Sequence, residues 1–321
     1  MGVPFDAVQT KKEFSFIGAG IALYYVISVV AFSLLCLLAA HVGGDWWESD
    51  VAKTVLSNLA YYICAFPVLY LVFARVERSQ WKKVGVSFGG WLIFLAVALG
   101  LMYIGGYVGN GMMGIFSALF GKNYTNGLNS LADGNMWVTA LITVVIAPLG
   151  EEFIYRKLII DRTAKYGCFL SVMLSATVFA LAHGNFYQLF YAFLVGLVLG
   201  YLYYRTGNLW VNFALHAFLN LWGGVIPMLL QGKLQEISEI AEFGQLLEYG
   251  GIVSVSMVMV VIQFASIAAA IVLPIVLRKR IVCPTAEISI PRGKVTTTVI
   301  CNVGILAMLA VYVLNLIMSL I

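Results

Sequence analysis

Residues 251–277 read GIVSVSMVMVVIQFASIAAAIVLPIVL, a run that contains no Asp, Glu, Lys or Arg. A helix needs about 20 consecutive apolar residues to cross the hydrocarbon core of a bilayer, and this run is long enough to do so. The rest of the chain is similar, because 62% of its 321 residues are hydrophobic and only 11% are charged. An ordinary soluble domain has about 25% charged residues. The sequence therefore predicts a membrane protein.

Outward from this run, further apolar stretches of about 20 residues indicate nine candidate spans. They lie at 17–41, 53–74, 90–110, 135–158, 168–184, 186–204, 208–230, 251–277 and 296–319. No long polar linker separates them, so we expect an all-α, polytopic transmembrane helical bundle of about eight or nine spans. Residues 1–321 then form a single membrane domain. Between spans, residues 111–134 suggest a surface-lying or re-entrant piece, and 235–248 an amphipathic interfacial helix.

The basic residues gather at alternate ends of these spans. Lys11 and Lys12 precede the first span, and the other Lys and Arg clusters fall on the same side under a nine-span count. The positive-inside rule then places the N-terminus in the cytoplasm, and short loops favour a prokaryotic plasma membrane. The net charge of +4 is too small and scattered to suggest a nucleic-acid partner. The five cysteines form no CxxC pair, so we interpret them as buried apolar residues.

The fourth span ends in an unusually polar stretch, PLGEEFIYRKLII at 148–160. Ionisable side chains cost about 2.5–3.5 kcal/mol at the centre of a membrane helix and therefore indicate a functional site. Glu152 and Arg156 are four residues apart and can neutralise each other on one helix face. Glu151 points about 100° away and has no partner in its own helix, as expected of a general base. The alternative is that these side chains reach out to the lipid headgroups.

Two further spans carry the polar residues that could join Glu151. The fifth contains Phe179 and His183 in VFALAHGNF, at a spacing of four residues. The seventh contains NFALHAFLN, in which three polar side chains four residues apart share one helix face: Asn212, His216 and Asn220. Only three histidines occur in the chain, and two of them lie in apolar helices near the paired glutamates.

These residue types suffice for hydrolysis of a peptide bond. A glutamate and a histidine can hold and deprotonate a water, while a second histidine and an asparagine amide can donate to the developing oxyanion. The same chain could instead bind zinc through Glu151, His183 and His216. Intramembrane Glu and His also occur in proton-coupled transporters, and a non-catalytic scaffold that regulates a sensor protein is a further alternative.

The three motifs GEEFIYR, FALAH and HAFLN resemble the successive EExxxR, FxxxH and HxxxN motifs of the CAAX-protease and bacteriocin-processing (CPBP, or ABI) family. The resemblance covers roughly residues 135–225, which would form the catalytic core. It implies an intramembrane endopeptidase acting on a peptide or a lipidated peptide within membrane lipid. Eukaryotic members of the family remove the C-terminal tripeptide of prenylated CAAX proteins, and bacterial members process or protect against small peptides.

The resemblance also implies a role for each residue. Glu151 would be the base and His183 its partner on the water, while His216 and Asn220 would form the oxyanion site. Glu152 and Arg156 would brace the first of these helices. We favour a mechanism without a cofactor, because Asn220 suits an oxyanion donor better than a zinc ligand.

The spacing of charges also predicts the depth of the site. Glu151 lies close to Arg156 and Lys157, which places it in the cytoplasmic half of the membrane. His183 fits this depth poorly, because it lies about 20 Å along a helix that starts near residue 169. That helix is therefore expected to be tilted, displaced or to begin deeper.

Overall fold

A computed structural model describes residues 4–124, 136–230, 249–284 and 286–321. Every regular element in these ranges is a helix, which confirms the predicted all-α class. The expected interfacial helix at 235–248 lies wholly outside the described residues.

Nine α-helices run for eight or more residues each within the described ranges. They are α1 (Ala7–Val42), α2 (Asp50–Leu59), α3 (Phe66–Phe73), α4 (Phe88–Phe120), α8 (Cys168–Ala182), α9 (Phe186–Thr206), α10 (Leu209–Asn220), α13 (Gly250–Val276) and α14 (Val303–Met318). Segments with wider, π-helical turns extend three of them: η2 (Ala60–Ala65) joins α2 to α3, η7 (Leu221–Val225) follows α10, and η11 (Thr296–Ile300) precedes α14. Single 3₁₀ turns lie at η1 (Trp46–Glu48), η9 (Arg278–Arg280) and η10 (Arg292–Lys294).

One long helical rod, Met136–Tyr166, carries both glutamates. It is built from six short pieces in succession: α5 (Met136–Leu141), η4 (Ile142–Ile146), α6 (Ala147–Glu151), η5 (Glu152–Leu158), α7 (Ile159–Thr163) and η6 (Ala164–Tyr166). Two of these pieces, η4 and η5, are π-helical and lie on either side of Glu151. Such wide turns inside α-helices are frequent at functional sites.

The number of long spans differs slightly from the nine predicted stretches. Among the described residues, seven helices are long and apolar enough to cross a membrane, and an eighth span results if the helix pair 292–300 and 303–318, bent by 65°, is counted as one. The stretch 168–184 is the exception, because α8 has 15 residues and is about 22 Å long. Residues 111–120 are not a surface-lying piece, because α4 continues through them to Phe120.

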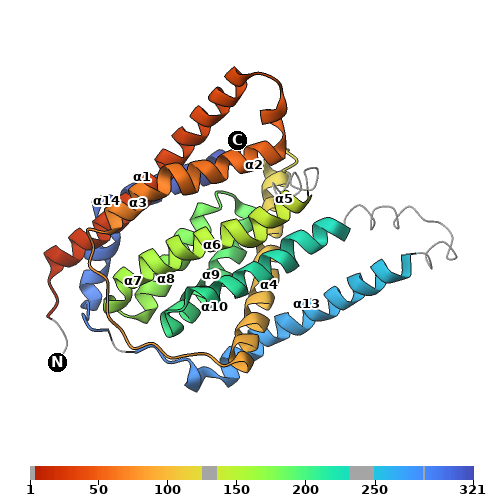
Figure 1. Ribbon diagram of the computed structural model, residues 1–321. Helices are drawn as coiled ribbons and strands as arrows, with labels where there is room; N and C mark the ends of the chain where they lie inside the picture. Colours follow the sequence, from red (N-terminus) through yellow and green to blue (C-terminus); the bar gives the residue numbers. More distant parts are fainter. Residues whose placement is uncertain (1–3, 125–135, 231–248, 285) are drawn as a thin grey trace.

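The helices surround a central group that holds the polar motifs. Figure 1 shows the rod of α5–α7 beside α8, α9 and α10, with α1, α3 and α14 on one side and α4 and α13 on the other. One apolar core joins α1, α3 and α14 to η5, α7 and α8, and a second joins α4 to α9 and α10. Long helix α13 packs mainly against α4, so most of its surface is open to lipid.

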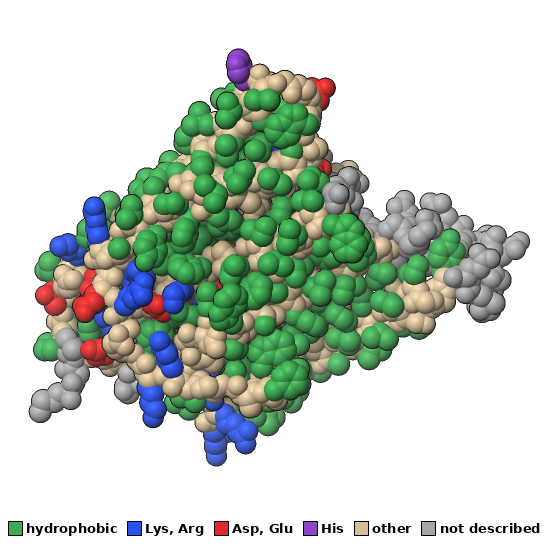
Figure 2. All heavy atoms as spheres, viewed as in Figure 1, with side chains coloured by type: hydrophobic (Ala, Val, Ile, Leu, Met, Phe, Trp, Pro, Cys, Tyr) green, Lys and Arg blue, Asp and Glu red, His purple; other side chains and the backbone are tan. Residues whose placement is uncertain are grey.

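The surface agrees with a bilayer environment. Figure 2 shows hydrophobic side chains over most of the visible face, while the Lys and Arg side chains gather at the end of the molecule near the N-terminus. Lipid-facing side chains need no protein partner, which explains this exposed apolar area. The protein is therefore an integral, multi-pass membrane protein.

Candidate active site

Glu152 is the centre of a fully buried polar network. Its side chain has no exposed surface, and its two carboxylate oxygens meet partners from two helices. Arg156 Nε lies 3.3 Å from Oε2. From α10, Asn212 donates its amide N–H to Oε2 at 3.0 Å, and His216 Nδ1 lies 2.9 Å from Oε1. The predicted Glu152–Arg156 pair is thus confirmed, and the alternative in which both reach lipid headgroups is wrong, because both are completely buried.

Arg156 has further neighbours that hold it in place. It donates to the Ser175 hydroxyl on α8 at 2.9 Å, and Ser175 donates in turn to the Tyr155 carbonyl at 2.7 Å. Its guanidinium also lies over the Phe179 ring, 4.6 Å from the ring centre. A buried charge is tolerated only where it is paired and hydrogen-bonded, so these contacts fix the rod against α8.

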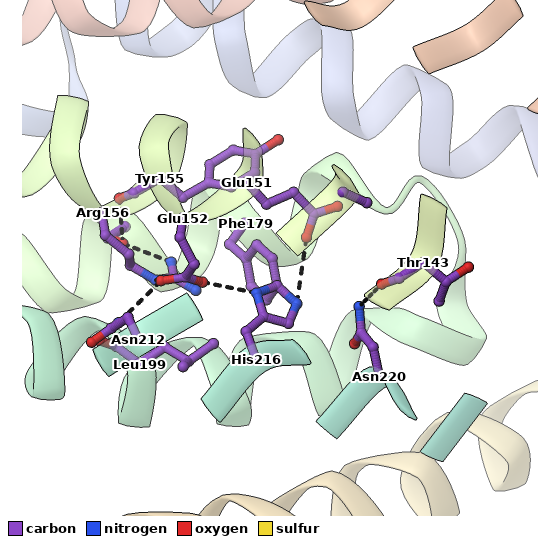
Figure 3. Close-up of polar contacts among 12 residues, drawn as sticks. Thr143, Glu151, Glu152, Tyr155, Arg156, Phe179, Leu199, Asn212, His216 and Asn220 are labelled. Carbon is purple, nitrogen blue, oxygen red and sulfur yellow. Dashed lines mark hydrogen bonds and ion pairs between the residues drawn. The ribbon is translucent and has the colours of Figure 1, made fainter. Parts of the chain in front are cut away.

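Glu151 approaches His216 from the opposite side of the ring and faces a cavity. Its carboxylate Oε2 is 3.5 Å from Nε2 of His216, and its side chain is 25% exposed. Figure 3 shows His216 between the two glutamates, with Glu152 at one ring nitrogen and Glu151 at the other. Because the Glu152 carboxylate accepts a hydrogen bond from Nδ1, the imidazole is oriented with Nε2 toward Glu151.

His183 is held by its own helix. Its Nδ1 lies 2.8 Å from the Phe179 carbonyl oxygen. A carbonyl can only accept, so the proton is on Nδ1, and in the neutral ring Nε2 is left as an acceptor. The Phe179 ring stands edge-on to both histidines, with ring centres 4.8 Å from His183 and 5.6 Å from His216. Phe179 therefore spaces the two imidazoles on one wall of the site.

The position of Asn220 follows from a proline in the rod. In the wide turn η4 the N–H of Ala147 donates to the Ile142 carbonyl, five residues back. The next carbonyl in that register, of Thr143, would need an N–H from Pro148, which has none. Asn220 on α10 donates to this carbonyl instead, at 2.9 Å. An asparagine amide has two N–H donors, so the second remains available.

These side chains line one cavity of about 580 Å³. All four residues predicted to be catalytic contribute to it: Glu151, His183, His216 and Asn220. The supporting residue Phe179 also lines the cavity, whereas Glu152, Arg156 and Asn212 lie behind the wall. The structure thus brings together every residue that the three motifs predicted for the site.

Other cavity residues were not predicted from the sequence. They are polar or aromatic side chains on α4, α9 and α13, namely Tyr103, Tyr107, Asn110, Tyr187, Gln188, Tyr191 and Gln263. Gln263 donates to the Tyr107 hydroxyl across the α4–α13 contact. A sequence signal for it exists, because Gln263 is the one amide side chain in the otherwise apolar run 251–277.

The predicted depth of the site requires correction. Glu151 is at the middle of the 31-residue rod Met136–Tyr166. Arg156 does not mark the membrane surface, since it is buried against Glu152. The rod turns back into α8 at Gly167, whose φ of 104° favours glycine. Glu151 lies sixteen residues before Gly167 and His183 sixteen after it, so the two meet at the same depth without a displaced helix.

The alternative zinc site requires Glu151, His183 and His216 to lie close enough together to bind one ion. Within the described parts of the chain, no three His, Cys, Asp or Glu side chains are grouped so that they could hold a metal ion. Glu151, His183 and His216 are thus not among the groups that would hold a metal ion in this arrangement of side chains.

Comparisons with known proteins agree with the position of this site. Residues 133–222 match the sequence model of the Rce1-like type II CAAX prenyl endopeptidase family. "UPF0177 protein YbdJ" of Lactococcus lactis is 34% identical over 105 residues, which cover 32% of this chain and 45% of that protein. "Putative membrane peptidase YdiL" of Bacillus subtilis is 23% identical over 219 residues, 65% of this chain and 87% of that protein. No solved structure matches the chain.

Proposed function

We propose that the protein is an intramembrane peptidase that uses Glu151 as its general base, and the match of residues 133–222 to the Rce1-like type II CAAX prenyl endopeptidase family supports this proposal. The observation that carries the proposal is the placement of Glu151. It is the one carboxylate among the described residues that line the cavity, and it faces His216 with His183 and Asn220 on the adjoining walls.

The proposed reaction begins with a water held between Glu151 and His183. Nε2 of His183 accepts one hydrogen of the water, and Glu151 removes the other as the oxygen attacks the peptide carbonyl. The new C–O bond gives a tetrahedral oxyanion. Glu151 then transfers its proton to the leaving nitrogen, the C–N bond breaks, and a carboxyl and an amino terminus result. General acid–base transfer of this kind contributes about 10²–10⁴-fold to a rate.

His216 and Asn220 are proposed to stabilise the oxyanion. Glu152 accepts from Nδ1 of His216 at 2.9 Å, so Nε2 can donate toward the cavity only when the ring carries both protons, and the imidazolium is the form proposed for this step. The amide of Asn220 is anchored to Thr143 by one N–H and offers the other. Donors fixed before the reaction cost no reorganisation when charge develops, and one such donor is worth about 10²–10³-fold in kcat.

The substrate is proposed to be a small membrane-associated peptide or a lipidated peptide, which enters the apolar, tyrosine-lined cavity. The enzyme would act in the plasma membrane of a prokaryote with its N-terminus in the cytoplasm. No metal is required in this mechanism, because its proton transfers and its oxyanion contacts are all assigned to protein side chains.

The test is cleavage of a quenched-fluorescence peptide library, including farnesylated CaaX peptides, by detergent-purified protein. Glu151→Gln keeps the shape of the side chain but removes the base, so it should abolish cleavage. Glu48→Gln, at an exposed glutamate in η1, is the matched control and should cleave like the wild type. If Glu151→Gln retained full activity, the base would be misassigned. If no peptide were cut and both variants still complemented a deletion strain, the scaffold alternative would replace the peptidase.

A further inference from the structure

A second large cavity lies outside the catalytic core, between α1 and the helix pair at the C-terminus. It has a volume of about 680 Å³ and is open to the surface. Its lining comes from the first turns of α1 and from η10, η11 and the start of α14, none of which falls within the matched residues 133–222. This groove has no role in the proposed reaction.

The groove results from a bend and a close helix crossing. Segments 292–300 and 303–318 meet at 65°, which turns η11 away from the direction of α14. Just after the bend, Gly304 packs directly on α1, where a Cβ at this position would lie 1.8 Å from the Ser15 carbonyl oxygen. The backbones of α1 and α14 are therefore in direct contact at one end of the groove.

Three lysines line the groove without a carboxylate partner. Within the described residues, Lys11, Lys12 and Lys294 take part in no ion pair. The two acids nearest to Lys11 and Lys12 in sequence already have other partners. Asp6 accepts from the N–H groups that begin α1, and Glu13 is bound by Lys165 at 2.8 Å. The groove therefore presents three lysine side chains with which no described carboxylate forms an ion pair.

Beside the hydroxyl side chains of Ser15, Thr297 and Thr298, part of the remaining wall is apolar and open to lipid. This part includes Phe16, Ala19 and Val303, and the Val303 side chain is 82% exposed. The neutral amide of Asn302 is already bonded within η11 and α14. A ligand that contacts both the lysines and the apolar part of the wall needs an anionic group for the lysines and a hydrocarbon chain for the apolar side chains.

We propose that this groove binds an anionic phospholipid, with the phosphate headgroup at Lys11, Lys12 and Lys294 and an acyl chain along Phe16 and Val303. Basic pockets between membrane helices bind acidic headgroups in this way, and each basic residue near the surface strengthens binding about fivefold. The bound lipid would connect α1 with the helix pair 292–300 and 303–318. Both lie outside the matched residues 133–222.

The test measures the thermal unfolding midpoint of detergent-purified full-length protein during titration with dioleoyl phosphatidylglycerol. Ligands that bind the folded state raise this midpoint by mass action. We expect a saturable rise with phosphatidylglycerol, and none with phosphatidylcholine or with inorganic phosphate at equal concentrations. In Lys11→Gln/Lys12→Gln/Lys294→Gln the half-maximal concentration should increase roughly a hundredfold.

A matched control removes the same charge elsewhere. Lys53→Gln/Arg278→Gln/Lys279→Gln changes exposed side chains outside the groove and should titrate like the wild type. Equal responses of both triple variants, or of both lipids, would overturn the proposal, and an equal rise with inorganic phosphate would show an anion site that does not select lipid. The single variant Lys294→Gln alters one exposed side chain and should shift the half-maximal concentration about fivefold, so it keeps the test available if the triple variant does not fold.

Discussion

Replacement of Glu152 by Gln should destabilise the protein strongly, although Glu152 does not face the cavity. Its carboxylate is completely buried and is the counter-ion of the equally buried Arg156 at 3.3 Å. Removal of one member of a buried ion pair leaves the other charge uncompensated, at a cost of about 3–5 kcal/mol. Gln keeps the volume of the side chain, so the loss reports charge rather than packing.

The assay is the unfolding midpoint of the purified protein in a fixed detergent. A loss of this size should lower the midpoint by roughly 5–10 °C. Glu151→Gln is the internal comparison, because its side chain is 25% exposed to the cavity and pairs only with His216 at 3.5 Å. It should abolish cleavage and leave the midpoint within about 2 °C of the wild type.

A second substitution tests the cause. In Glu152→Gln/Arg156→Met the unpaired cation is also removed, and most of the lost stability should return, since buried ion pairs can often be replaced by apolar groups without a large cost. Catalysis should not return, because His216 would still lack the carboxylate that orients it. The reasoning is refuted if Glu152→Gln has the same unfolding midpoint as the wild type. It is also refuted if the double variant Glu152→Gln/Arg156→Met has a lower midpoint than Glu152→Gln alone.

Three further outcomes follow from single contacts. Asn220→Ala should reduce kcat by about 10²–10³-fold with little change in KM, measured on any peptide found to be cleaved; a change confined to KM would argue against an oxyanion donor. Gly304→Ala should lower the unfolding midpoint by several degrees, because its Cβ would meet the α1 backbone, whereas Gly114→Ala has open space around it and should have little effect or raise the midpoint. Cys168 and Cys283, whose sulfur atoms are 2.8 Å apart as free thiols, should be crosslinked by mild oxidation of the purified protein; their failure to appear as a linked peptide by mass spectrometry would contradict the packing of this segment on α8.

The helical class and the positions of the spans were largely predictable from hydropathy alone. The period of apolar residues and the cost of charge in a bilayer restrict a chain of this composition to helices. The span count was less secure at 168–184, because α8 is short and its C-terminal end lies inside the protein, where no lipid boundary requires full length. The expectation of a surface-lying or re-entrant piece was wrong for residues 111–120. Glycines in this stretch suggest such a piece, but α4 continues through them to Phe120.

The three motifs predicted which residues meet at the site, but not how they meet. Sequence spacing predicted the Glu152–Arg156 pair, because residues four apart share a helix face. It assigned Asn212 and His216 to the site but could not show that both would bond to Glu152, since those contacts join residues 60 and 64 positions apart. The premise for the depth of the site was wrong, because Arg156 is buried against Glu152 and does not mark the membrane surface.

Composition and the spacing of residues within one helix were enough to predict the membrane environment, the helical class of fold and the set of polar residues. The packing of the helices was needed to show that Asn212 and His216 both bond to Glu152, which carbonyl anchors Asn220 and which side chains of α4 and α13 complete the walls. The physical reason is that hydropathy and helical period act along the chain, whereas hydrogen bonds and ion pairs between helices depend on where neighbouring helices cross. The turn at Gly167 is one example, because it brings Glu151 and His183 to the same depth only when the two helices fold back on each other.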